Sequence, residues 1–126
     1  MANSITYGLT HLAIAVRDLK RTLNFYQNVF DMQVMYIKTD FLQLTTPGCN
    51  DILVFEEKTD AIIGNSGGIA HFGFRLVDPQ GINMIVSRLK ELGAAIIDQG
   101  EFVKGSPYVF FRDPDGYEVE VWYELL

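Results

Sequence analysis

The chain has 126 residues, a formal net charge of −6 and a single cysteine. This length suits one domain, and 48% hydrophobic with 21% charged residues is ordinary for a globular protein. The acidic balance and scattered basic residues argue against nucleic acid or an anionic membrane as partner. One cysteine excludes an internal disulfide. The sequence also lacks a signal-like start and a run of ~20 apolar residues, so it predicts a cytoplasmic protein that binds small molecules.

The first half predicts one strand, one helix and three further strands. Residues 5–16 alternate and are rich in aliphatic side chains, so they predict a strand whose parity turns His11 away from the helix-packed core. Asp18 is the expected N-cap of an amphipathic helix that continues through Phe30. The three extended runs that follow are separated by turn residues and cover Gln33–Lys38, Phe41–Thr45 and residues 51–56.

The second half repeats this plan after a linker at residues 58–68. A strand at residues 69–77 is followed by Asp78 as N-cap, Pro79 at the first helical position and Gly93 as the helix stop. Three more strands are expected at residues 94–98, 108–112 and 117–123. The sequence therefore predicts a single α+β domain of two βαβββ modules, about residues 5–57 and 69–123, that form an open, curved mixed sheet around a metal-binding cleft.

Two stretches of the chain share a pattern that includes its only two histidines. Each has a glycine three residues before the histidine and an aspartate seven residues after it, and the offset between His11 and His71 is 71 − 11 = 60. The repeat places both imidazoles at equivalent positions on the first strands of the two modules. Both are therefore expected to point into the cleft.

Glu120 is the third candidate ligand. It lies in the middle of the last expected strand between Val119 and Val121, where a carboxylate is costly without a compensating partner. Two imidazoles and one carboxylate match a site of the 2-His-1-carboxylate kind, which leaves positions open for substrate. The alternative is a metal-free pocket with structural histidines.

The chain resembles the vicinal oxygen chelate superfamily, which contains glyoxalases, extradiol dioxygenases, fosfomycin-resistance enzymes and bleomycin-resistance proteins. The motifs that carry the resemblance are the stretch at residues 9–18, the helix at residues 24–30 and the Asp-Pro-Asp-Gly-Tyr-Glu-Val-Glu ending at residues 113–120. The resemblance implies that His11, His71 and Glu120 bind a divalent ion (Fe, Mn, Zn or Ni).

The resemblance also implies a function and an assembly. It points to a homodimer and to a metal-dependent lyase, isomerase or dioxygenase acting on a substrate with vicinal oxygens. The alternative is a non-catalytic protein of the bleomycin-resistance type that sequesters a small molecule.

Glyoxalase I would have a fourth ligand on the last strand of the first module. Aligning Pro47 with Pro114 puts Leu53 opposite Glu120, and leucine cannot bind a metal. Glu56 has the opposite parity to Leu53 and would need a bulge to reach the site. Leu53 is instead expected to present an apolar side chain to the substrate, and the sequence is atypical for glyoxalase I.

Other residues are expected to shape the cleft. Arg75 shares the parity of His71 and is a candidate for binding an anionic group of the substrate or for a salt bridge at the rim. Tyr108 is a candidate acid or hydrogen-bond donor, with wall packing as its alternative. Phe110 shares its parity, and Phe55 and Trp122 occupy equivalent places in the two modules. These three are expected to line the cleft or a dimer interface.

Overall fold

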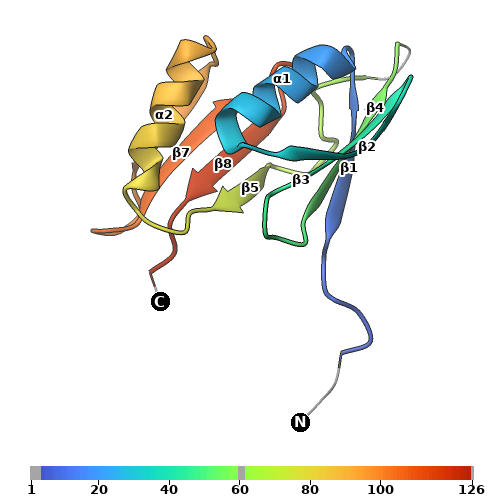
Figure 1. Cartoon of the computed structure of the whole chain (residues 1–126). Coiled ribbons are helices and arrows are strands. Elements are labelled where there is room, and N and C mark those ends of the chain that lie inside the picture. Colours follow the sequence, from blue (N-terminus) through green and yellow to red (C-terminus); the bar gives the residue numbers. More distant parts are fainter. Residues whose placement is uncertain (1–3, 60–61, 126) are drawn as a thin grey trace.

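The computed structural model describes residues 4–59 and 62–125, and Figure 1 shows two helices on one side of two sheets. The first module consists of β1 (His11–Val16), α1 (Leu19–Phe30), β2 (Gln33–Lys38), β3 (Phe41–Thr45) and β4 (Ile52–Glu57). The second consists of β5 (Phe72–Arg75), α2 (Gly81–Glu91), β6 (Ile96–Glu101), β7 (Pro107–Arg112) and β8 (Glu118–Trp122). The α+β class and the repeated βαβββ order are confirmed.

Helix α1 forms as predicted. Asp18 is its N-cap, and the carboxylate accepts hydrogen bonds from the backbone N–H groups of Lys20 and Arg21. The buried face of α1 includes Phe25, Tyr26 and Val29, and the helix ends where Asp31 adopts a left-handed conformation at φ 58°. The spacing of its apolar residues and the position of its N-cap indicate the same helix, so both ends are predicted correctly.

Several predicted starts are wrong, among them that of the strand expected at residues 69–77, which is β5 and covers only Phe72–Arg75. Strand β1 begins at His11 rather than at residue 5, because Gly8 has φ 86° and leaves the extended region. Helix α2 begins at Gly81 rather than at Pro79. Asp78 accepts a hydrogen bond from the Gln80 N–H, and its own carbonyl accepts one from Gly81, so the residues after Asp78 form a turn before the helix.

The eight strands form two separate four-stranded sheets rather than one continuous sheet. Their orders are β1-β4-β3-β2 and β5-β8-β7-β6. In each sheet the first strand runs parallel to the last strand of its module, and the remaining pairs are antiparallel. Strands β1 and β5 therefore each leave one edge unpaired, and these two edges belong to different sheets.

The core is shared by the two modules because α1 contacts both. The Tyr26 ring lies 5.0 Å from that of Phe55 in the first sheet, and the Phe25 ring lies 6.1 Å from that of Phe111 in the second. Tyr26, Phe55 and Phe111 have no exposed surface. Among the described residues, no helix covers the opposite face of either sheet. We call these the open faces.

No helix among residues 4–59 and 62–125 is long and apolar enough to cross a membrane. The cytoplasmic location expected from the sequence stays a prediction.

The Asp113-Pro-Asp-Gly turn before β8 joins the two modules. The buried Tyr26 hydroxyl donates a 2.9 Å hydrogen bond to the carboxylate of Asp113. Asp115 accepts hydrogen bonds from the Arg17 N–H at 3.0 Å and from the Arg21 guanidinium at 2.8 Å. The Tyr117 hydroxyl donates to the Ala15 carbonyl at 2.7 Å. The turn therefore fixes how the second sheet sits against the first module.

The linker is held against this turn at Gly64, which gives a first prediction. A side-chain carbon at Gly64 would overlap the backbone carbonyl oxygen of Asp115, and the residue has φ 82°. Gly64→Ala should therefore destabilise the chain by about 3 kcal/mol or more, because the strain of a left-handed residue is joined by a backbone clash. Chemical denaturation followed by circular dichroism measures this loss.

Gly48→Ala is the matched control. Gly48 has a similar φ of 77° but nothing within 4 Å of an added carbon, so it should cost only the conformational strain of about 1–2 kcal/mol. Equal losses for the two variants would show that the contact with Asp115 contributes nothing.

Candidate metal centre

The second sheet brings two of the three predicted ligands together. Glu120 lies on β8 and His71 immediately precedes β5, and the two strands are paired. His71 Nε2 and Glu120 Oε1 are 3.2 Å apart, and the Glu120 side chain is 13% exposed. The pair lies on the open face, because Val119 and Val121, on either side of Glu120, are buried under the helices.

Gly73 makes room for this carboxylate. It pairs with Glu120 across the two strands, and a carbon added to it would lie 3.6 Å from Glu120 Oε1 and 3.1 Å from the Glu120 carbonyl oxygen. A larger side chain would crowd the carboxylate from the open side. The absence of a side chain at Gly73 therefore has a packing role.

The donor set and spacing of this pair fit a divalent metal ion. Imidazole nitrogen and carboxylate oxygen bind such ions at about 2.0–2.2 Å, so two donors at right angles about one ion are about 3 Å apart. The 3.2 Å separation of His71 and Glu120 has that size. Glu118 Oε2 lies 3.9 Å from His71 Nδ1, on the other side of the ring. A carboxylate there would favour the tautomer that leaves Nε2 free to bind a metal.

His11 is not part of this cluster. It is exposed at the start of β1, and no three His, Cys, Asp or Glu side chains gather to hold a metal among residues 4–59 and 62–125. Both histidines do border one open hollow of about 390 Å³ between the edges of β1 and β5. A single chain therefore supplies the His71–Glu120 pair but does not bring His11 to it.

The strand register corrects the expected counterpart of Glu120. Ala13 pairs with Val54 in the first sheet, as Gly73 pairs with Glu120 in the second. Ala13 and Gly73 are 73 − 13 = 60 residues apart, like the histidines. Val54, not Leu53, is thus the equivalent of Glu120. Leu53 pairs with Leu12 and belongs to the hydrophobic core under the helices, so the prediction that it contacts the substrate is wrong.

The same strand register changes the face of the sheet on which Glu56 and Phe55 are expected to lie. Glu56 pairs with Ala15 and shares the parity of His11, so it reaches the open face of the first sheet without a bulge. Phe55 lies on the opposite face and is fully buried against Tyr26. The prediction that Phe55 lines the cleft is therefore wrong.

Comparison with known proteins identifies the family. Residues 8–121 match the family described as the glyoxalase/bleomycin resistance protein/dioxygenase superfamily. The chain belongs to this superfamily. It is 32% identical over 119 residues to a catechol-2,3-dioxygenase of Bacillus subtilis, covering 90% of this chain and 41% of that protein. The chain thus spans about two-fifths of the length of that relative.

Other relatives of the chain are closer to it in length. A probable trivalent organoarsenical cleaving enzyme of Bacillus subtilis is 29% identical over 118 residues, which covers 90% of this chain and 77% of that protein. The fosfomycin resistance protein FosX of Listeria monocytogenes has the same fold, with a TM-score of 0.79 and 22% identity over 97% of each chain. These likenesses establish the superfamily fold over nearly the whole chain.

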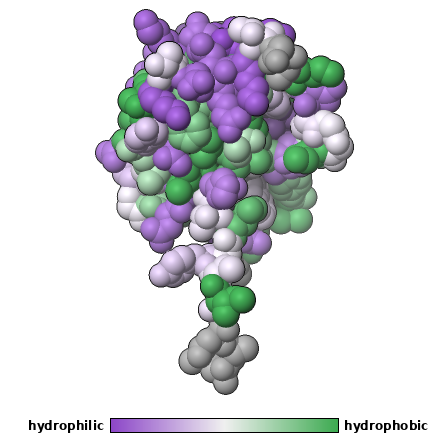
Figure 2. All heavy atoms as spheres, turned by 90° about the vertical axis from the view of Figure 1, so that its right-hand side faces the viewer, coloured by the Kyte–Doolittle hydropathy of each residue, from purple (hydrophilic) through white to green (hydrophobic). Residues whose placement is uncertain are grey.

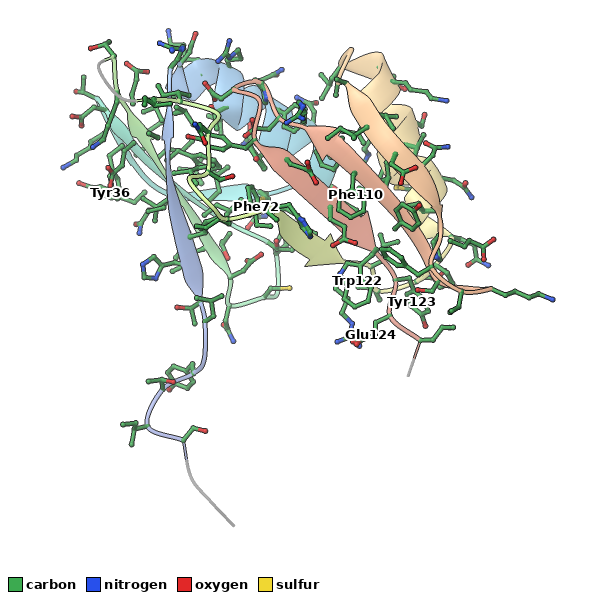
Figure 3. All side chains as sticks on the ribbon, turned by 180° about the vertical axis from the view of Figure 1, so that it is seen from behind. Tyr36, Phe72, Phe110, Trp122, Tyr123 and Glu124 are labelled. Carbon is green, nitrogen blue, oxygen red and sulfur yellow. The ribbon has the colours of Figure 1, made fainter. Side chains whose placement is uncertain are left out.

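In this member of the superfamily, aromatic side chains line the open face of the second sheet (Figure 3). Phe110 pairs with Glu120, and its ring lies 5.1 Å from the His71 ring. The next pair of residues on this face is Tyr108 and Trp122. The Tyr108 ring stacks on the Phe102 ring, with their centroids 4.2 Å apart. Phe110 and Trp122 therefore share the open face with the His71–Glu120 pair.

Tyr108 has a partner that the sequence analysis did not identify. Its hydroxyl donates a 3.0 Å hydrogen bond to the carboxylate of Asp98 on β6, and this bond raises the pKa of the Tyr108 phenol. The ring lies over Gly100, where an added carbon would be 3.2 Å from the hydroxyl oxygen. A raised pKa makes the phenol a weaker acid, so this geometry favours a wall residue over a proton donor.

Arg75 lies on the same open face, where its guanidinium forms a 3.1 Å ion pair with Glu124. Its side chain is 50% exposed, so this is a rim salt bridge, the alternative considered from sequence. The charge of Arg75 is already paired, which weakens its case as the group that binds an anionic substrate.

The sequence analysis missed Glu118 and Asp98 as parts of this face. Glu118 shares the parity of Glu120 and directly precedes Val119, the partner of Phe72. Because Phe72 pairs with Val119, the residues before them, His71 and Glu118, are also neighbours. This relation could have pointed to Glu118. Asp98 could not be found in this way, because a register shift between Ile96 and Asp98 changes which residues of β6 face Tyr108.

Proposed function

We propose that this chain is a metal-dependent enzyme that acts on a small molecule through two neighbouring oxygen atoms. The observation that carries the proposal is the His71–Glu120 pair, 3.2 Å apart on the open face of a sheet. A mostly buried carboxylate in mid-strand is costly to keep uncompensated, and an imidazole nitrogen at this spacing is the partner a metal site requires.

The relatives support a metal-dependent activity without fixing the reaction. Those matched include a catechol dioxygenase, a metallothiol transferase and a manganese-dependent 2,3-dihydroxybiphenyl 1,2-dioxygenase. One FosX structure with the same fold, at a TM-score of 0.76, holds Mn(II) and a dihydroxypropylphosphonic acid. Manganese is named for two of these proteins, and lyase, isomerase and dioxygenase chemistry are all compatible with a divalent ion.

We propose His11 as the third ligand, supplied by a second copy of the chain. Within one chain the two open faces belong to separate sheets that pack through their helices, and residues 4–59 and 62–125 bring no third donor to the His71–Glu120 pair. His11 is exposed on the other sheet with an unpaired strand edge beside it. A two-fold dimer that places β1 of each chain beside β5 of the other would complete two equal sites.

The residues of this chain would then have distinct tasks. A bound divalent ion supplies Lewis-acid stabilisation of negative charge on substrate oxygens. His11, His71 and Glu120 hold it by three donors and leave positions open. Glu118, whose carboxylate lies 3.9 Å from His71 Nδ1, would have to move closer to hydrogen-bond the ring and orient it. Phe110 and Trp122 provide apolar contact for the body of the substrate and exclude water beside the polar pair.

The second candidate is a sequestering protein of the bleomycin-resistance type. The aromatic open face, with Phe110 and Tyr108 beside Trp122, is suited to binding a planar molecule without any metal. This candidate predicts no metal binding by the pair. Measuring the metal therefore decides between the two.

Replacing one ligand tests the proposal. Untagged protein is expected to bind about one Mn(II) per chain by calorimetry and elemental analysis. Glu120→Gln should weaken that affinity by about 100-fold or more, since loss of a ligand exceeds the 10–100-fold effect of an outer-shell change. Thermal unfolding without metal should change little, because the side chain is on the open face.

Glu91→Gln is the control for charge, because Glu91 is exposed at the end of α2. It should bind Mn(II) like the native chain. Native protein that binds no divalent ion, or a Glu120→Gln variant with native affinity, would leave the sequestering protein as the better candidate.

A further inference from the structure

The segment before β1 carries apolar side chains that no other described residue of the chain covers. Ile5, Tyr7 and Leu9 are 102%, 101% and 99% exposed, so they are as accessible as in an isolated extended peptide. We call residues 4–10 the arm. Figure 2 shows it projecting from the body with hydrophobic atoms on its surface. Three such side chains in succession on a short exposed segment are typical of a docking element rather than of ordinary surface.

The arm leads directly into a candidate ligand. The Thr10 carbonyl accepts a 2.7 Å hydrogen bond from Ile52 on β4, so the chain is fixed to the first sheet where His11 begins β1. Leu9 is two residues from His11, and an extended chain rises about 3.3 Å per residue. Leu9 must therefore lie within about 7 Å of His11 along the chain, and Ile5 within about 20 Å.

We propose that the arm of each chain docks on the second sheet of a second copy, where it forms part of the wall of the metal-containing cleft. This inference rests on the proposed function, which places His11 at the His71–Glu120 pair of another copy. If His11 lies there, Leu9 and Tyr7 cannot be far from the same open face.

The chemistry of the two surfaces agrees. On the open face, Phe110 adjoins the ligand pair and Trp122 lies two residues beyond Glu120, or about 7 Å along β8. Tyr7 and Leu9 would be covered by these rings and would cover them in return. The arm then contributes two side chains that contact a substrate bound in the cleft of the second copy. These are specificity-determining positions outside the ligand set.

Trp122 is the only tryptophan of the chain, so it reports directly on this face. The test compares the native protein with an Ile5→Ser/Tyr7→Ser/Leu9→Ser variant in the presence of Mn(II). Sedimentation gives the dimer dissociation constant, and acrylamide quenching gives the accessibility of Trp122. We expect the variant to dimerise at least 10-fold more weakly. We also expect its Trp122 to be quenched more strongly than that of the native protein at a concentration where both are dimers.

The matched control is Val77→Ser/Met84→Ser. Val77 and Met84 are 98% and 60% exposed and line a hollow beside α2, away from the ligand pair. This variant should have the native dimer constant and native quenching. Tyr7→Ser alone provides a second arm variant with a smaller change of sequence, and it should raise the quenching in the same direction.

The outcomes separate this inference from the function it rests on. A native protein that dimerises and binds Mn(II), with arm variants indistinguishable from the control, overturns the arm proposal and leaves the enzyme proposal standing. Weaker dimers with unchanged Trp122 quenching also overturn it, because the arm then docks elsewhere. A native protein that binds no Mn(II) fails the proposed function, whatever the arm variants do.

Discussion

Mixing chains that carry His11→Ala with chains that carry Glu120→Gln is expected to restore metal sites that neither variant has alone. If His11 of one chain completes the His71–Glu120 pair of another, each mixed dimer contains one site with all three ligands and one site with a single native ligand. After random exchange, half of the dimers are mixed, so Mn(II) should bind at about one ion for every two dimers. The separate variants should bind almost none.

The matched control mixes His71→Ala with Glu120→Gln. These two changes affect the same half of the site, so no mixed dimer contains an intact set and no binding should return. A site contained within one chain would behave differently, since neither mixture could restore it. Native protein that binds one ion per chain while the His11→Ala and Glu120→Gln mixture stays empty would therefore refute the shared site.

Asp113→Ala is expected to destabilise the fold by about 3–4 kcal/mol. Asp113 is 5% exposed. One carboxylate oxygen accepts hydrogen bonds from the backbone N–H groups of Asp115, Gly116 and Tyr117, each at 3.0 Å. The other accepts from the Tyr26 hydroxyl. Alanine would leave these donors without their partner, and urea unfolding measures the loss.

Asp113→Asn is the matched control, because its amide oxygen can still accept the three backbone hydrogen bonds. Burial raises the pKa of Asp113 above its ordinary value of 3.8, although hydrogen bonds from Tyr26 and the backbone oppose this. A raised folded-state pKa means that stability present at low pH is lost as the pH rises through that pKa. Asparagine does not ionise and escapes this loss.

The unfolding free energy of the Asn variant, relative to the native protein, should therefore increase as the pH is raised from about 4 to 7. At neutral pH the Asn variant should stay within about 1 kcal/mol of native stability. An Asn variant as unstable as the Ala variant would show that the charge itself, rather than its hydrogen bonds, holds the turn.

The elements with strong local signals could be predicted from the sequence. Asp18 and the apolar spacing of α1 determine that helix, and β2 and β3 have the predicted bounds. The repeat of His11 and His71 also identified the order of the two modules. These features depend on neighbouring residues, so a single sequence contains them.

Features that depend on tertiary register could not be read in the same way. Aligning the turns before β4 and β8 selected Leu53, whereas the paired strands select Val54. One residue of shift exchanges the open face for the covered face, which is also why Phe55 was misplaced. The separation of His11 from Glu120 has another cause: it depends on how two sheets pack, and no local pattern specifies that.

The outer and inner edges of the two sheets differ in a way that bears on aggregation. An exposed strand edge can add strands from other chains without limit. The outer strands β2 and β6 each carry a register shift, between Val34 and Tyr36 and between Ile96 and Asp98, and such irregularities twist an edge away from further pairing. Strands β1 and β5 pair without a shift. Association should therefore be confined to the inner edges and should end at a closed pair rather than continue into a fibre.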